Sequence, residues 1–119
     1  MNNGSVYTLD EIRERIIPVA QKYNIPLVYI FGSYARKDAT SESDIDLLID
    51  ADYITGFFAI GSVFTALEES LGKEIDLITL RAFEKSDDLL FVERVTKERV
   101  LIYDDRERLE CYTAYKTAL

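Results

Sequence analysis

Apolar residues recur along this chain in two spacings, one typical of helices and the other of strands. Near the N-terminus, apolar positions three or four residues apart predict a helix over roughly 9–23. Thr8, with Glu11 three residues later, fits a capping box that opens this helix. Pro18 lies inside the pattern, so we expect a kink or a split there. The continuous apolar run at 27–31 predicts a buried strand.

The same alternation of spacings continues to the C-terminus. Gly72 directly follows the helical pattern that ends at Leu71, and we expect it to end that helix as a C-cap glycine. The order of elements predicts an α/β domain with a small mixed β-sheet and flanking helices. A chain of 119 residues has room for one core, so we expect a single domain over 1–119. After 27–31 we expect a short helix at 34–37, a strand at 44–50, a helix from about 57 to 71, a strand at 74–80, a helix near 83–95, a strand at 99–103, and a closing helix that is capped by Asp104 or Asp105 and bears Leu109, Tyr112 and Leu119.

Composition narrows the available chemistry. The single cysteine, Cys111, excludes an internal disulfide, and the absence of histidine excludes histidine ligands and histidine bases. Carboxylates must therefore carry any acid–base or metal work. A formal net charge of −8 argues against direct nucleic-acid binding, which depends on clustered Lys and Arg. The single cysteine also leads us to expect a reduced, cytoplasmic location. No apolar run approaches the ~20 residues of a membrane span, so we expect no membrane association.

The most informative motif joins a Gly-Ser pair to two aspartates. Gly32 and Ser33 follow the predicted strand, and Asp44 and Asp46 follow after ten intervening residues. A strand that runs into Gly-Ser suits a tight turn where backbone N–H groups and a hydroxyl meet a phosphate. Alternate residues of a strand share a face, so the two aspartates would point the same way. Adjacent carboxylates repel each other, and a divalent metal beside a polyphosphate would resolve that repulsion.

A third aspartate extends the motif. Asp76 lies on the predicted strand 74–80, and its side chain should face away from those of Ile75 and Leu77. Taken alone, it fits equally well an exposed acid on a half-exposed sheet. If its strand lies beside 44–50, however, three carboxylates converge at one end of the sheet. Such a set is what a two-magnesium site for phosphoryl or nucleotidyl transfer requires.

The motif and the order of elements resemble the minimal nucleotidyltransferases of the DNA polymerase beta superfamily. Gly32-Ser33, Asp44-x-Asp46 and the later Asp76 carry the resemblance, which covers most of the chain. It is nearest to the MntA-type antitoxins, which are paired with toxins that carry a HEPN domain. The resemblance implies a polymerase-beta-like fold. One departure is Lys37, where many relatives have a glycine.

The resemblance also implies a role for each motif residue. Asp44 and Asp46 would hold two Mg²⁺ ions, one of them shared with the phosphates of ATP. Asp76 would complete the metal site and help to deprotonate the attacking hydroxyl. Gly32 and Ser33 would cradle the β and γ phosphates of the nucleotide. Apart from the resemblance, the positive charge of Arg36 suits a contact with the nucleotide near the leaving group, although it equally fits an ordinary exposed residue of a surface helix.

The activity implied is that of an antitoxin in a type VII-like toxin–antitoxin pair. It would move AMP from ATP to a tyrosine hydroxyl of its HEPN toxin, release pyrophosphate, and form a hetero-oligomer with that toxin. Three alternatives stay open: an antitoxin that masks the toxin by binding alone, a nucleotidyltransferase with a small-molecule acceptor, and a non-enzymatic α/β interaction protein.

Overall fold

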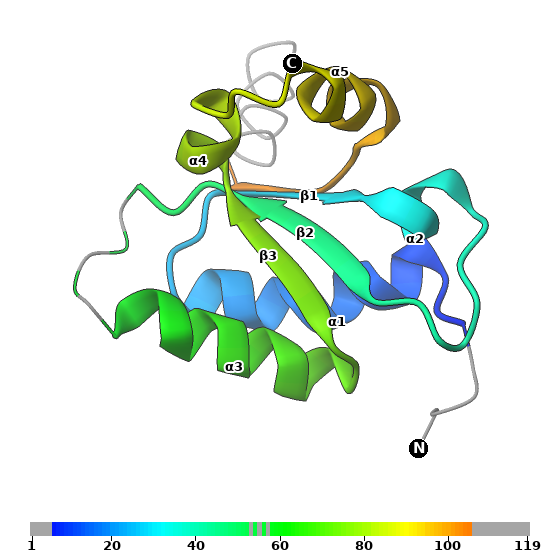
Figure 1. The fold of residues 1–119 in the computed structure, drawn as a ribbon. Helices are drawn as coiled ribbons and strands as arrows, with labels where there is room; N and C mark the ends of the chain where they lie inside the picture. The colour runs from blue at the N-terminus through cyan, green and yellow to red at the C-terminus, as the bar shows by residue number, and fades with distance from the viewer. Residues whose placement is uncertain (1–5, 53, 55, 57, 106–119) are drawn as a thin grey trace, which may run out of the picture.

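The computed structural model describes residues 6–105 except 53, 55 and 57, and its helices and strands alternate up to two consecutive helices near the end (Figure 1). None of the helices in this described part is long and apolar enough to cross a membrane. The predicted closing helix with Leu109, Tyr112 and Leu119 lies outside the described residues. The elements are α1 (Leu9–Lys22), β1 (Leu27–Phe31), α2 (Gly32–Arg36), β2 (Ile45–Ile49), α3 (Ala59–Leu71), β3 (Ile75–Thr79), α4 (Leu80–Glu84), α5 (Leu89–Glu98) and β4 (Val100–Asp104).

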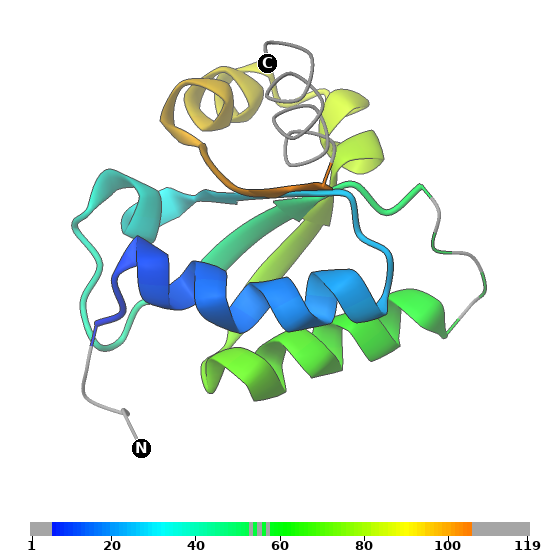
Figure 2. The same cartoon turned by 180° about the vertical axis from the view of Figure 1, so that it is seen from behind.

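The four strands form one mixed sheet in the order β3-β2-β1-β4, which confirms the predicted fold class. β1 is antiparallel to β2 and β4, while β2 and β3 are parallel. A parallel pair needs a crossover connection, and α3 supplies it. Helices α1 and α3 cover one face of the sheet, and α4 and α5 cover the other (Figures 1 and 2).

Helix α1 begins with the predicted capping box. The Thr8 hydroxyl accepts the Glu11 N–H at 3.1 Å, and the Glu11 carboxylate accepts the Thr8 N–H at 2.8 Å. The predicted split at Pro18 is wrong, because one helix runs through this residue. Pro18 lies on the exposed side, while Ile16 and Val19 are buried on either side of it. Burial of that apolar face outweighs the cost of a proline in a helix, about 3 kcal/mol.

The segment predicted as one helix near 83–95 contains two. Thr79 caps α4 by accepting the Ala82 N–H at 3.1 Å, and Asp88 caps α5 by accepting the Phe91 N–H at 3.1 Å. Both caps satisfy backbone N–H groups that an interrupted helix would leave without partners. The second helix also continues to Glu98, beyond the predicted end.

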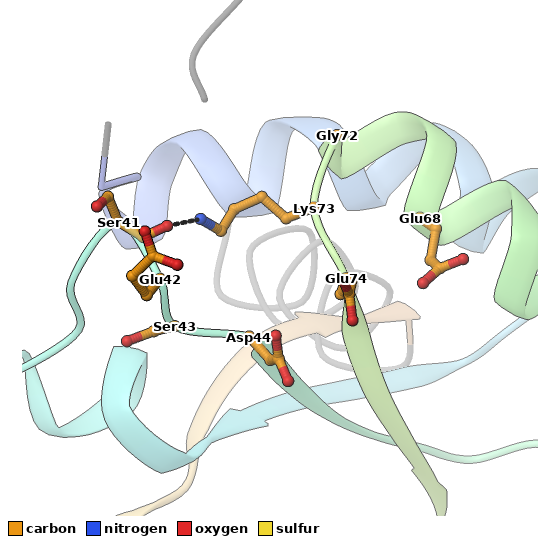
Figure 3. A pocket seen from close by; sticks show the side chains of 8 residues that line it. All are labelled: Ser41, Glu42, Ser43, Asp44, Glu68, Gly72, Lys73 and Glu74. Atoms are coloured by element: carbon orange, nitrogen blue, oxygen red, sulfur yellow. Dashed lines mark hydrogen bonds between the residues drawn. The ribbon is translucent and has the colours of Figure 1, made fainter. Parts of the chain in front are cut away.

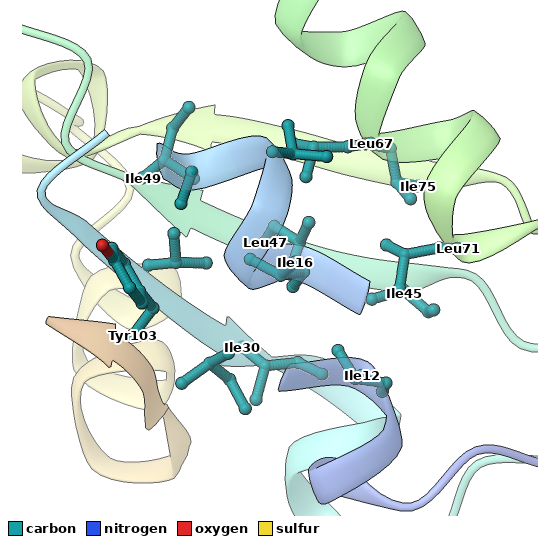
Figure 4. Close-up of a cluster of buried hydrophobic side chains, with 14 of the residues drawn as sticks. Ile12, Ile16, Ile30, Ile45, Leu47, Ile49, Leu67, Leu71, Ile75 and Tyr103 are labelled. Carbon is teal, nitrogen blue, oxygen red and sulfur yellow. The ribbon is translucent and has the colours of Figure 1, made fainter. Parts of the chain in front are cut away.

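Two apolar cores hold the sheet from opposite faces. The larger core lies between the sheet and helices α1 and α3, and its side chains interdigitate in Figure 4. A smaller core joins Phe31 and Leu48 of the sheet to Phe83 of α4 and Val95 of α5. The sheet is therefore covered on both sides, which explains why the run at 27–31 is apolar throughout. The labelled members of the larger core in Figure 4 are Ile12, Ile16, Ile30, Ile45, Leu47, Ile49, Leu67, Leu71, Ile75 and Tyr103.

Helix α2 ends at a residue in the left-handed region. Lys37 has φ = 68° and ψ = 29°, and its N–H donates to the Tyr34 carbonyl at 3.3 Å. Lys37 thus adopts a backbone conformation that favours glycine. The lysine is accommodated, but at a cost in backbone strain.

Lys37→Gly is expected to raise the free energy of unfolding by about 0.5–1 kcal/mol. The left-handed conformation costs an L-residue about 1–2 kcal/mol, and the greater freedom of an unfolded glycine offsets only part of that. Urea unfolding followed by circular dichroism measures the change. Lys37→Ala is the matched control, since it removes the same side chain and keeps the Cβ. An equal gain in both variants would show that the side chain, and not the backbone, causes the strain.

Candidate active site

Two of the motif carboxylates lie side by side on the parallel strands. Asp46 of β2 is paired in register with Asp76 of β3. The neighbours of Asp46 on its own strand, Ile45 and Leu47, are fully buried in the larger core, so the aspartate points to the opposite face. Asp44 comes immediately before β2 begins and is exposed. The expected adjacency of the two strands is therefore confirmed.

One cavity brings the predicted site residues together. Its volume is about 600 Å³, and it lies where α2, β2, β3 and α5 meet. Its polar side contains all six residues that the sequence singled out, and its apolar side is formed by β1, β3 and α5. The polar lining residues are Gly32, Ser33, Arg36, Ser43, Asp44, Asp46, Asp76 and Arg94, and the apolar ones are Phe31, Leu77, Ile78 and Phe91.

Asp46 occupies an environment that disfavours its charge. Burial, followed by a hydrogen bond with Asp76, raises the pKa of Asp46 to about 7. The negative charges of Asp76 and Asp44 act in the same direction, and the positive charge of Arg36 opposes them. Near neutral pH, the Asp46 carboxyl therefore tends to keep its proton. A cation in the cavity would replace that proton and relieve the repulsion.

The described part of the chain contains no group of three or more Asp, Glu or Cys side chains already arranged to hold a metal ion. The donor chemistry itself fits a hard cation such as Mg²⁺, which prefers carboxylate oxygens.

Close packing against Asp46 makes a glycine necessary at position 32. Gly32 has φ = 74°, in the left-handed region. A Cβ added there would lie 2.9 Å from Asp46 Cγ and would overlap one of the carboxylate oxygens. The Gly-Ser turn and the carboxylate pair are therefore in direct contact, although the sequence separates Gly32 from Asp46 by thirteen residues.

Sequence reasoning missed the contribution of α5 to the site. Phe91 and Arg94 line the cavity, and the carboxylate of Glu98 reaches the Gly-Ser turn. It accepts the Gly32 N–H at 2.7 Å and a hydrogen bond from Arg36 Nη1 at 3.1 Å. Hydrogen bonds to Glu98 and then to Asp38 raise the pKa of Arg36 above its ordinary value. No local signal predicts these contacts, because Glu98 lies 66 residues from Gly32.

A second cavity of about 490 Å³ adjoins the first at Asp44, which lines both (Figure 3). Acidic side chains dominate it: Glu42, Asp44, Glu68 and Glu74. Lys73 also lines this cavity, and its ammonium donates to the Ser41 carbonyl at 3.0 Å. Asp44 thus stands between the candidate site and an acidic depression.

Comparison with known families identifies the fold. The family described as "Polymerase beta, Nucleotidyltransferase" matches residues 14–108, which include every motif residue named above. The chain belongs to this nucleotidyltransferase family. Its four-stranded mixed sheet with flanking helices is accordingly a polymerase-beta-like nucleotidyltransferase fold. The resemblance inferred from the Gly-Ser and aspartate motifs is confirmed.

Three similar proteins cover between 77% and 92% of this chain. A Methanocaldococcus jannaschii protein named "putative protein adenylyltransferase" is 34% identical over 92 residues, which are 77% of this chain and 95% of that protein. A solved structure named "putative minimal nucleotidyltransferase" is 27% identical, with a TM-score of 0.62, over 82% of this chain and 98% of that one. A chain from a solved complex of tri-AMPylated Shewanella oneidensis HEPN toxin with MNT antitoxin has a TM-score of 0.57 and 20% identity, over 92% of this chain and 84% of that one. At this identity the last likeness shows the fold alone.

Gly32→Ala should lower the free energy of unfolding by about 2–3 kcal/mol. The alanine would have to adopt a left-handed backbone conformation, and its Cβ would collide with the Asp46 carboxylate. In an Asp46→Ala background, the same substitution should lower the free energy of unfolding by only about 1–2 kcal/mol, since the left-handed backbone is then its main cost. Urea denaturation of the four proteins measures the difference. An equal loss in both backgrounds would contradict the predicted collision.

The metal-free protein is expected to lose stability as the pH rises from about 4 to 7. The folded state keeps the Asp46 proton up to about pH 7, whereas the unfolded chain releases it near the ordinary pKa of 3.8. The folded state therefore binds more protons in this window, and stability declines with rising pH. Asp46→Asn should reduce the decline, as measured by thermal unfolding at pH 5 and pH 8 in EDTA. Asp52→Asn is the control, and parallel behaviour of all three proteins would refute the assignment.

Proposed function

We propose that this chain is a protein adenylyltransferase and the antitoxin of a toxin–antitoxin pair. It moves AMP from ATP to a tyrosine hydroxyl of a HEPN-domain toxin, with Mg²⁺ as the cofactor and pyrophosphate as the product. The observation that carries the proposal is the pairing of Asp46 with Asp76 in one cavity with the Gly32-Ser33 turn. The relative named as a protein adenylyltransferase supports the same activity.

The acidic residues of the cavity suit a divalent cation. Asp44 and Asp46 would hold it, and Asp76 would complete the set. The raised pKa of Asp46, caused first by burial and then by the neighbouring Asp76 and Asp44, is consistent with this assignment, because a bound cation would stabilise the ionised carboxylate that this environment disfavours. When bound, the metal supplies charge neutralisation at the phosphates and makes the attacking hydroxyl more acidic.

The remaining groups act on the triphosphate and the acceptor. The Ser33 hydroxyl and the Arg36 guanidinium line the cavity and would bind the phosphate oxygens. The tyrosine oxygen forms a bond to the α-phosphorus, and the bond from that phosphorus to the bridging oxygen of pyrophosphate breaks. Asp76, the more exposed member of the pair, would accept the hydroxyl proton. Catalysis then rests on positioning and on charge neutralisation.

The acceptor in this proposal is a protein because the described domain is small and its cavity is open to a docked partner. The complex of an AMPylated HEPN toxin with an MNT antitoxin, a chain of which shares this fold, supports a HEPN toxin as that partner. Two proteins joined in this way would form a hetero-oligomer. The acceptor tyrosine would have to reach the cavity beside Asp46 and Asp76.

Incubation of the protein with ATP, Mg²⁺ and its neighbouring HEPN protein should add multiples of an AMP mass to that protein, as measured by intact-mass spectrometry. Asp44→Asn together with Asp46→Asn should abolish the addition, because the variant lacks the carboxylates that would hold the metal. Asp52→Asn together with Asp87→Asn is the matched control. It removes the same charge from exposed positions outside the cavity and should keep full activity.

The results separate the proposal from its competitors. Labelling that persists in the Asp44/Asp46 variant would overturn the metal assignment. If that variant fails to label the HEPN protein but still neutralises its toxicity fully, the chain is an antitoxin that acts by binding alone. Transfer of AMP to a small molecule, with no transfer to the protein, would indicate a small-molecule acceptor.

A further inference from the structure

The carboxylate of Glu98 joins the Gly-Ser turn to the far end of α5. One of its oxygens accepts the Gly32 N–H at 2.7 Å, and the other accepts from Arg36 Nη1 at 3.1 Å. The Glu98 side chain is only 11% exposed, whereas that of Arg36 is 41% exposed. Hydrogen bonds to an ionised carboxylate are stronger than those between neutral groups, and the low exposure of Glu98 limits their screening by solvent.

Helix α5 holds Glu98 rigidly. Val95, one turn earlier, is fully buried in the smaller core. The next residue, Arg99, lies with its guanidinium 4.2 Å from the centre of the Tyr29 ring. Packing on both sides of Glu98 therefore fixes the backbone that carries its carboxylate. A side chain supported in this way can define the geometry of the groups it binds.

Both residues bound by Glu98, Gly32 and Arg36, line the cavity at the Gly-Ser turn, where the nucleotide phosphates would bind. Glu98 accepts the single N–H of Gly32, and this hydrogen bond helps to fix the turn. The neighbouring Ser33 and the guanidinium of Arg36 line the cavity. Arg36 is held from two directions, since its Nε also donates to Asp38 at 3.3 Å.

We infer that Glu98 is a positioning residue for the triphosphate of the nucleotide. From α5 it fixes the Gly32-Ser33 turn and directs the Arg36 guanidinium toward the cavity. This inference rests on the proposed function, because it assumes that the cavity binds a nucleoside triphosphate. Removal of a negative charge next to phosphates would ordinarily strengthen their binding. If Glu98 positions the turn and Arg36, its removal should instead weaken nucleotide binding.

The test compares Glu98→Ala and Glu98→Gln with the unaltered protein in the AMP-transfer assay. Glu98→Ala should raise the KM for ATP about tenfold or more with little change in kcat, since the lost contacts act in the ground state and the transition state alike. Glu98→Gln keeps an oxygen for the Gly32 N–H and loses the ion pair with Arg36. Its KM should lie between the other two. Glu93→Ala, an exposed acid on the same helix, is the charge-matched control and should keep the original KM.

A double-mutant cycle with Arg36→Ala tests whether Glu98 influences nucleotide binding through Arg36. If Glu98 acts in part through Arg36, Glu98→Ala should raise KM less in the Arg36→Ala background than in the unaltered protein. Thermal unfolding without nucleotide accompanies each variant and shows whether it is folded at the assay temperature.

Several outcomes would overturn the inference. A lower KM in Glu98→Ala would mean that the carboxylate competes with the phosphates. An unchanged KM in a folded variant with reduced stability would reduce Glu98 to a structural contact. Failure of the proposed function gives a different pattern, because the unaltered protein would then show neither AMP transfer nor an ATP-dependent thermal shift with Mg²⁺.

Discussion

The register between the parallel strands β2 and β3 is the constraint on which the site depends. It sets Asp46 opposite Asp76, and the same alternation sends Ile45 and Leu47 into the larger core. A slip of one residue would exchange these faces and bury a carboxylate in an apolar interior. The hydrophobic packing that stabilises the sheet therefore also aligns the acidic pair.

The register places like charges together, and the electrostatic cost falls on Asp46. Burial and neighbouring carboxylates raise the pKa of Asp46 to about 7, so the metal-free site is electrostatically unfavourable. The backbone has adapted to the same carboxylate, because Gly32 leaves it room that any other residue would fill. An unfavourable charge and a backbone conformation that favours glycine meet where the chemistry is proposed.

Helix α5 completes the cavity wall formed by α2 and the sheet. It contributes Phe91 and Arg94 to the cavity wall and Glu98 to the Gly-Ser turn. The break after α4 makes this possible, because the cap at Asp88 starts a new helix that runs back over the sheet (Figure 2). A single continuous helix through this region would lack the turn that sets the direction of α5.

Local patterns by themselves determined most of the elements and the candidate acidic residues. The capping box at Thr8, the buried run at 27–31 and the left-handed Gly72 are each decided by neighbouring residues, so the sequence was sufficient to predict them. The Gly-Ser and aspartate spacing was likewise sufficient to indicate the family. Continuity of α1 through Pro18 was not predictable in this way, because it depends on burial against the sheet.

Only the tertiary structure decided which distant groups meet. The contact between Gly32 and Asp46, the pairing of Asp46 with Asp76, and the hydrogen bonds of Glu98 all join residues far apart in the chain. Such contacts follow from strand order and helix packing, which depend on the whole apolar core. A linear pattern records which side chains are present and how they alternate. It does not record which of them the folded core brings within hydrogen-bonding distance.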